Sequence, residues 1–165
     1  MAVANTKSSS ITNADASPKV ANNSFVEKGI MRSSVATLAV AAADDNDSVY
    51  RFVRLPSNAR LCHIWLLNDA ITSGTDYNFG IYETADNGGA AKDDNVFADA
   101  VDLSSARVEP IDILFEALDI DEAETRLWQM LALTEDPHKD YDLCAIGVTV
   151  GTGAGDITLN VEFVL

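Results

Sequence analysis

The stretch that decides the fold is residues 49–83, which read VYRFVRLPSNARLCHIWLLNDAITSGTDYNFGIYE. Three apolar runs, at 49–55, 61–67 and 77–82, are separated by turn residues such as Pro56, Asn58 and Asn68. Short runs rich in β-branched and aromatic side chains, bounded by turn residues, predict consecutive antiparallel strands. The middle run, LCHIWLL, is too short for a stable helix. It is predicted to be a central strand covered on both faces.

Further strands are expected on both sides of this stretch. Residues 25–31 are strand-like, and residues 33–43 are ambiguous because their alanines favour helix while Val35 and Thr37 favour strand; we expect a strand. A short strand is predicted at 108–114. The segments 141–151 and 155–165 predict two closing strands joined by a hairpin turn, since the second alternates cleanly between apolar and polar residues.

Two segments have helical spacing. Residues 95–103, NVFADAVDL, predict a short helix capped by Asp94 or Asn95. Residues 119–133, DIDEAETRLWQMLAL, predict a second one, capped by Asp119 or Asp121, with acidic residues in its first turn. Its buried side is expected to comprise Leu127, Trp128, Met130, Leu131 and Leu133. The pattern as a whole predicts a mostly β domain with one or two short helices in its connections.

Charge is distributed unevenly along the chain. The protein has 26 acidic and 11 basic residues, a formal net charge of −15, which argues against direct nucleic-acid binding. Residues 1–43 hold four basic and two acidic residues, a net +2, so the seven basic and 24 acidic residues that remain give −17. A mildly basic arm is therefore attached to an acidic body. Either the arm meets an acidic surface or the body of a neighbouring copy, or its four dispersed cations have no function.

The N-terminal segment is too polar to fold alone. Residues 1–24 are mostly Ser, Thr, Asn, Ala and Asp, and cannot bury enough apolar surface to offset roughly 1–2 kcal/mol of backbone entropy per residue. We expect this segment to be disordered when free, or ordered by a partner. The 165 residues are accordingly divided into an extended N-terminal arm, 1–34, and a β-sandwich domain, 35–165.

The sequence predicts a soluble protein made in a reducing cytoplasm. Cys62 and Cys144 lie in apolar strand-like runs and are expected to be buried reduced thiols rather than a disulfide. The N-terminus lacks the charged and apolar regions of a signal peptide, and no run approaches the ~18 apolar residues of a membrane span.

Chemical motifs are weak. The acidic turn at 44–47 lacks the glycine of a calcium loop, and Arg51 and Arg54 are expected to pair with local carboxylates. Cys62 and His63 are adjacent in a strand and point to opposite faces, so His63 is predicted to be structural rather than a metal ligand. HExxH, CxxC, phosphate-loop and nucleophile-elbow motifs do not occur. We therefore predict no enzyme, no catalytic residue, no cofactor and no metal.

Several segments together resemble a group of phage proteins. In order they are YRFVRLPSNARL, LNDAITSGTDYNFGIYETADNGGA, VFADAVDLSSA, RLWQMLALTEDPHKDYDL and GTGAGDITLNVEFVL, within residues 49–165. The order resembles small structural proteins of tailed bacteriophages, the capsid decoration or cement proteins. The resemblance implies a jelly-roll-like antiparallel β-sandwich on the outside of an HK97-type capsid shell. It also implies clamping of neighbouring major capsid subunits, often by dimers or trimers.

The resemblance gives the first functional hypothesis, a structural virion protein at the capsid surface with the major capsid protein as partner. Like its relatives it would be a homo-oligomer, with no direct contact to nucleic acid or membrane. The arm is expected to bind a partner through its larger apolar and its basic residues: Val3, Lys7, Ile11, Lys19, Val20, Phe25, Lys28 and Arg32.

Two alternatives remain open. One is a carbohydrate-binding or host-adhesion module, which would need exposed aromatic platforms. Trp65 and Trp128 fall in apolar runs and are predicted to be core, leaving Tyr77, Tyr82 and Tyr141 as weak candidates. The other alternative is a head-to-tail or tail component of the virion.

Overall fold

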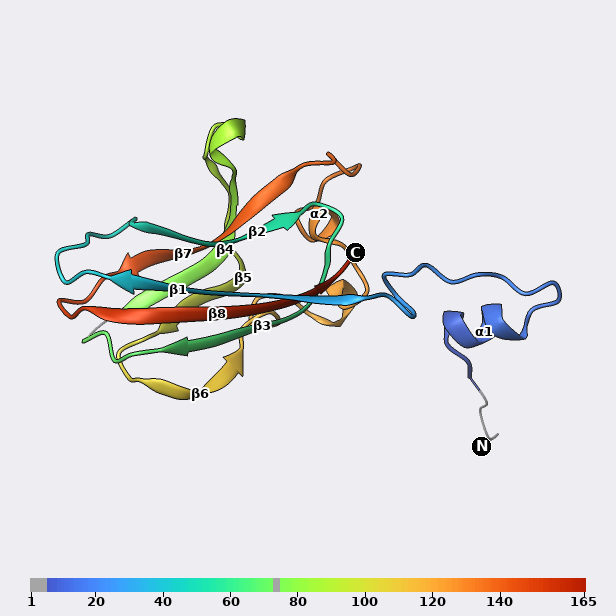
Figure 1. Ribbon diagram of the computed structural model, residues 1–165, viewed down its shortest axis with the longest axis horizontal. Coiled ribbons are helices and arrows are strands. Elements are labelled where there is room, and N and C mark those ends of the chain that lie inside the picture. The colour runs from blue at the N-terminus through green and yellow to red at the C-terminus, as the bar shows by residue number, and fades with distance from the viewer. Residues whose placement is uncertain (1–5, 73–74) are drawn as a thin grey trace.

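In the part of the chain that the structure describes, eight strands form two antiparallel sheets that pack face to face (Figure 1). The computed structural model describes residues 6–72 and 75–165. The first sheet has the order β1 (Met31–Val40), β8 (Gly155–Val164), β3 (Arg60–Asn68) and β6 (Arg107–Asp112). The second has the order β2 (Val49–Pro56), β7 (Asp140–Thr149), β4 (Asp76–Glu83) and β5 (Ala91–Asp102). The predicted mostly β fold is confirmed.

The strand order is that of a jelly roll. Every connection except β4–β5 passes from one sheet to the other, so strands 1, 8, 3 and 6 face strands 2, 7, 4 and 5. The runs at 49–55, 61–67 and 77–82 are strands as predicted, but they alternate between the sheets and are not neighbours. For the same reason residues 150–154 cross between the sheets, and the predicted hairpin turn between the two closing strands is wrong.

The core lies between the inner faces of the two sheets. In β8, Ile157, Leu159 and Val161 point inward and are fully buried, while Thr158 and Asn160 alternate with them on the outer face. The largest fully buried side chains come from both sheets and their connections: Tyr77, Tyr141, Phe79, Phe97, Leu55, Leu61, Ile64, Leu66, Ile71, Ile81, Leu103 and Ile113. Period-two alternation is therefore what places the core residues.

The strand covered on both faces is β7, not β3. β3 is central in its sheet, but Trp65 and Leu67 lie half-buried on its outer face. In β7, by contrast, every residue from Tyr141 to Gly147 is buried. Its outward carboxylate, Asp142, is covered by two arginines of β2. The apolar outer face of β3 made its run look like a fully buried strand.

The helix predicted at 95–103 is wrong, because these residues belong to β5. Ala100 has a positive φ of 52°, and the pairing of β5 with β4 shifts register at several points. These irregularities break the alternation, so that Val96, Phe97 and Val101 are all buried. A bulged strand thereby acquires the spacing of a helix face.

The helix predicted at 119–133 is much shorter than expected. Only a 3₁₀ turn, η2 (Ile120–Glu122), and a one-turn helix, α2 (Leu127–Met130), form. The backbone N–H groups of Leu127 and Trp128 donate to Ala59 and Ser57 of the β2–β3 turn, so no helix can continue backward through them. Asp119 caps η2 as predicted, and Leu127 is buried as predicted.

The β6–β7 connection, residues 113–139, ends in a loop held to the β2–β3 turn. The Asp136 carboxylate accepts hydrogen bonds from the Ser57 hydroxyl and, at 2.9 Å, from the His138 N–H. Burial raises the pKa of Asp136, but these two hydrogen bonds, together with the charges of His138 and Arg126, outweigh it and hold the pKa below its usual 3.8. Another 3₁₀ turn, η1 (Ala85–Asn87), lies at the tip of the β4–β5 hairpin.

The described part of the arm contains one helix and joins β1 directly. α1 (Ser9–Asp15) is capped by Ser8 and has no buried residue. Residues 25–30, expected to be strand-like, form turns, while residues 31–34 of the predicted arm belong to β1. None of the helices in the described part of the chain is long and apolar enough to cross a membrane.

Candidate functional site: the N-terminal arm and the sheet surfaces

Residues 6–24 fold into a small lobe that stands clear of the sandwich (Figure 1). Lys7 Nζ lies 2.8 Å from Asp15 Oδ2, and the Val20 N–H donates to the Asn13 carbonyl at 3.1 Å. The Asn22 side chain accepts from Asn13 Nδ2 at 2.6 Å and donates to Glu27. Within the described residues, every hydrogen bond of 6–24 stays inside the arm. The lobe is therefore available to a partner.

The base of the arm is fixed to the sandwich at Phe25. The Arg126 guanidinium lies 4.2 Å from the Phe25 ring centroid, and Arg60 Nε donates to the Phe25 carbonyl. Gly29 packs so closely that a Cβ there would collide with the Val164 side chain and the Ser24 carbonyl. Phe25 thus contacts its own sandwich. Sequence reasoning missed Arg60 and Arg126, since nothing in their local sequence indicates contact with the arm.

The predicted apolar arm residues differ in exposure. Ile11 is 51% exposed on α1 and Val20 is 53% exposed, whereas Phe25 is half-buried. Val3 lies outside the described residues. Two large aliphatic side chains of the lobe therefore face solvent.

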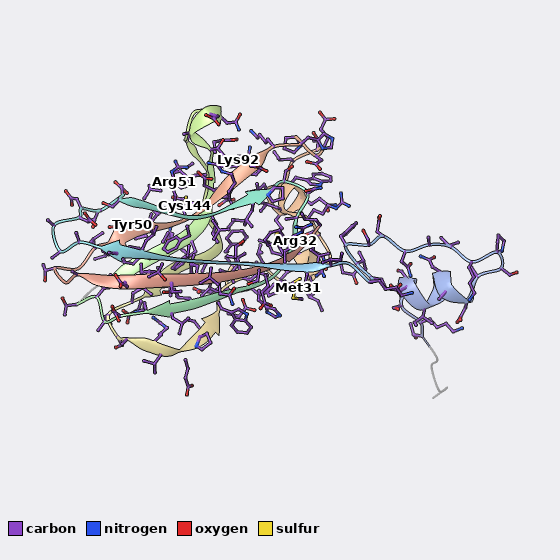
Figure 2. The ribbon with its side chains drawn as sticks, viewed as in Figure 1. Met31, Arg32, Tyr50, Arg51, Lys92 and Cys144 are labelled. Carbon is purple, nitrogen blue, oxygen red and sulfur yellow. The ribbon has the colours of Figure 1, made fainter. Side chains whose placement is uncertain are left out.

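The four predicted basic residues are all exposed. Lys7 pairs with Asp15, and Lys28 Nζ lies 3.3 Å from Glu27 Oε1. Arg32 sits on β1, at the junction of arm and sandwich (Figure 2). Lys19 of the lobe and Lys28 of the turn that follows it line the same hollow, together with Val20 and Glu27. The structure therefore brings three of the eight predicted residues together.

The arginines of β2 hold the outer face of their sheet together. Arg51 and Arg54 each lie 2.9 Å from one oxygen of Asp142, whose side chain is only 10% exposed. Arg51 also donates to the carbonyls of Glu83 and Gly89, which ties down the β4–β5 hairpin. The prediction that both arginines pair with a local carboxylate is confirmed.

His63 and Trp65 form a small aromatic pair on the outer face of β3. Their ring centroids lie 4.9 Å apart with an interplanar angle of 22°. His63 Nδ1 lies 2.7 Å from Asp112 Oδ2, as expected of a satisfied structural histidine. The prediction that Trp65 belongs to the core is wrong. Stacking on His63 covers one face of its indole.

The two cysteines are free thiols with different exposure. Cys144 is fully buried in β7, and burial raises its pKa to about 12. Cys62 is half-buried. Over residues 6–72 and 75–165, no three His, Cys, Asp or Glu side chains gather in a way that could hold a metal ion.

Sequence reasoning also missed an exposed apolar surface, residues 115–124 of the β6–β7 connection. Ile120 is 87% exposed and Phe115 41% exposed. They line a shallow hollow of about 360 Å³ with Leu118 and Ala123. An isolated Ile between two aspartates was the available signal, but the helical spacing of 119–133 concealed it.

Comparison with known proteins reveals similarity in fold. No protein-family model matches the sequence, and no curated protein matches it either. A chain of the solved capsid of Ralstonia phage GP4 superimposes with a TM-score of 0.59 at 14% identity, covering 82% of this chain and 84% of that one. A chain of the cyanophage Pam1 capsid gives 0.46 at 13% identity, covering 83% and 86%. One from the capsid of Helicobacter pylori bacteriophage KHP30 gives 0.40 at 16%, covering 82% and 94%.

Proposed function

We propose that this chain is a structural virion protein that binds the outer surface of a bacteriophage capsid and stabilises it. Its action would be to clamp neighbouring major capsid protein subunits. The observation that carries the proposal is the jelly roll shared with a chain of the phage GP4 capsid over 82% of this sequence. The sequence resemblance to phage decoration proteins supports the same assignment.

The mechanism is adhesive and needs no catalysis. The arm, 1–34, and the sheet edges would bury surface across joints between capsid subunits, with the sandwich, 35–165, as the rigid body. The lobe's two solvent-facing aliphatic side chains and its exposed cations support this role. Each contact is weak, but the contacts of many copies on a symmetric shell add up through multivalency.

The test is removal of residues 1–24. This truncation leaves the Phe25 contacts and both sheets in place, so the sandwich should melt as the full chain does. Attachment of the truncated protein to undecorated capsids should be weaker, measured by co-sedimentation over a range of protein concentrations. Equal attachment of the two proteins would contradict the role of the arm.

Glycan binding or host adhesion is the second candidate, because Trp65 lies on the outer surface next to His63. Binding of the isolated protein to a glycan array, together with its absence from purified heads, would favour this function. A head-to-tail or tail component, the third candidate, differs in copy number per particle.

A further inference from the structure

The surface at 115–124 has the features of a docking site. Ile120 projects from η2 with 87% of its surface exposed, next to the apolar hollow formed with Phe115, Leu118 and Ala123. Contiguous exposed apolar side chains framed by charges are typical of interaction surfaces. We call Ile120 with its neighbours Asp119 and Asp121 the acidic knob.

The segment that carries the knob has only negative charges. Residues 115–124 contain five acidic residues and no basic one: Glu116, Asp119, Asp121, Glu122 and Glu124. The Asp119 and Glu122 carboxylates are used in the capping box of η2. The Asp121 carboxylate makes no hydrogen bond or ion pair with the rest of the described chain. A partner of the knob should therefore be apolar and basic.

The arm lobe has this complementary character. A hollow of about 440 Å³ beside it is lined by Val20, two alanines and the polar Asn22 and Ser24. Its charged lining residues are Lys19, Lys28 and Glu27, of which Lys28 and Glu27 pair with each other. Val20 is 53% exposed, and Lys19 makes no ion pair among the described residues. An isoleucine flanked by carboxylates is complementary to the apolar lining at Val20 and to the unpaired ammonium of Lys19.

The two surfaces lie at the same end of the molecule. The arm leaves the sandwich beside the β6–β7 connection, where Arg126 contacts Phe25, and Figure 2 shows Met31 and Arg32 at this junction. In Figure 1 the lobe nevertheless stands away from its own sandwich. When two copies meet at this end, the knob of each copy can therefore contact the lobe of the other.

We propose that the acidic knob of one copy seats on the arm lobe of a second copy. Ile120 enters the hollow beside Val20, and the Asp121 carboxylate meets the Lys19 ammonium. The pairing deepens the proposed function, on which its biological role rests, because copies linked through their arms hold one another on a shell. It is tested without capsids, so its failure and that of the proposed function are separable.

The first experiment compares a knob variant with a matched control. Ile120→Ser removes the knob, while Val108→Ser changes an equally exposed residue, at 86%, on β6. Sedimentation equilibrium of the full chain should give a mass above the monomer, unchanged in Val108→Ser and weakened at least roughly tenfold in Ile120→Ser. Raising salt from about 50 mM to about 500 mM should weaken association, since the charges are exposed.

The second experiment exchanges the charges. Lys19→Glu and Asp121→Lys should each weaken self-association. An equimolar mixture of the two variants should recover part of it, because both knob–lobe contacts of a mixed pair join opposite charges. Glu109→Lys, an exposed acidic position on β6, should have no effect. Melting temperatures confirm that every variant is folded.

Three results would overturn the proposal: a full chain that stays monomeric, association insensitive to Ile120→Ser, or a mixture no stronger than the single variants. A monomeric chain whose attachment to capsids still requires residues 1–24 would show that the arm binds the shell instead. In that case the proposed function stands and the pairing of copies fails.

Discussion

Replacing Phe25 by alanine should release the base of the arm while the sandwich stays folded. The ring lies 4.2 Å from the Arg126 guanidinium, a cation–π contact worth about 0.5–2 kcal/mol. Burying about half of a Phe side chain contributes about 1 kcal/mol more. The Arg60 hydrogen bond to the Phe25 carbonyl is retained in Phe25→Ala, because it uses the backbone. The loss is therefore about 1.5–3 kcal/mol, or about 10- to 150-fold in the opening equilibrium.

The assay is amide hydrogen exchange at the turn that Phe25 anchors. The N–H groups of Val26 and Glu27 donate to the Asn23 carbonyl at 3.1 and 3.0 Å, so their exchange reports opening of this turn. Phe25→Leu, which retains apolar burial but loses the cation–π contact, should fall between wild type and Phe25→Ala. Ile30→Ala, at a residue 77% exposed, should change nothing. Exchange in Phe25→Ala at the wild-type rate would refute the reasoning.

Two other predictions concern the sandwich itself. Because hydrogen bonds lower the folded-state pKa of Asp136, the stability it contributes is present above its usual 3.8 and is lost as pH falls through the folded-state value. The melting temperature should therefore fall more steeply between about pH 6 and about pH 2 for wild type than for Asp136→Asn. Melting temperatures that fall in parallel for the two proteins would contradict this prediction. At pH 8, a thiol reagent should modify Cys62 in the folded protein but not Cys144, whose pKa is about 12. Cys62→Ser should thus react only after denaturation. Rapid reaction of the folded variant would show that Cys144 is accessible and would contradict its burial.

Local sequence patterns predicted most of the strands. The alternation in 155–165 is that of β8, and the apolar runs between turns correspond to β2, β3 and β4. These predictions succeed because each strand buries one face, and a period of two follows directly from strand geometry. The resemblance, rather than the periodicity, implied the jelly roll. Which strands pair depends on contacts between distant residues, which local patterns do not encode.

The errors occurred where tertiary contacts override local pattern. Bulges in β5 gave a strand the spacing of a helix, and backbone hydrogen bonds to the β2–β3 turn kept α2 to one turn. Trp65 was assigned to the core because an apolar residue on an outer sheet face looks the same in sequence as one on an inner face.

The arm was recognised by its composition, but its contacts were not. The packing of Phe25 under Arg126 joins residues about a hundred positions apart. Ile120 lay inside a helical pattern, so its exposure became visible only in three dimensions. The arm's role as a partner-binding segment and its boundary at residue 34 stay predictions.

The most direct test of the central claim is the copy number of this chain in purified virions, relative to the major capsid protein. Quantitative mass spectrometry of intact particles measures this ratio. A capsid-clamping protein should be present in a fixed ratio, at a copy number comparable with that of the major capsid protein. Absence from the particle, or the few copies expected of a tail or head-to-tail component, would contradict it.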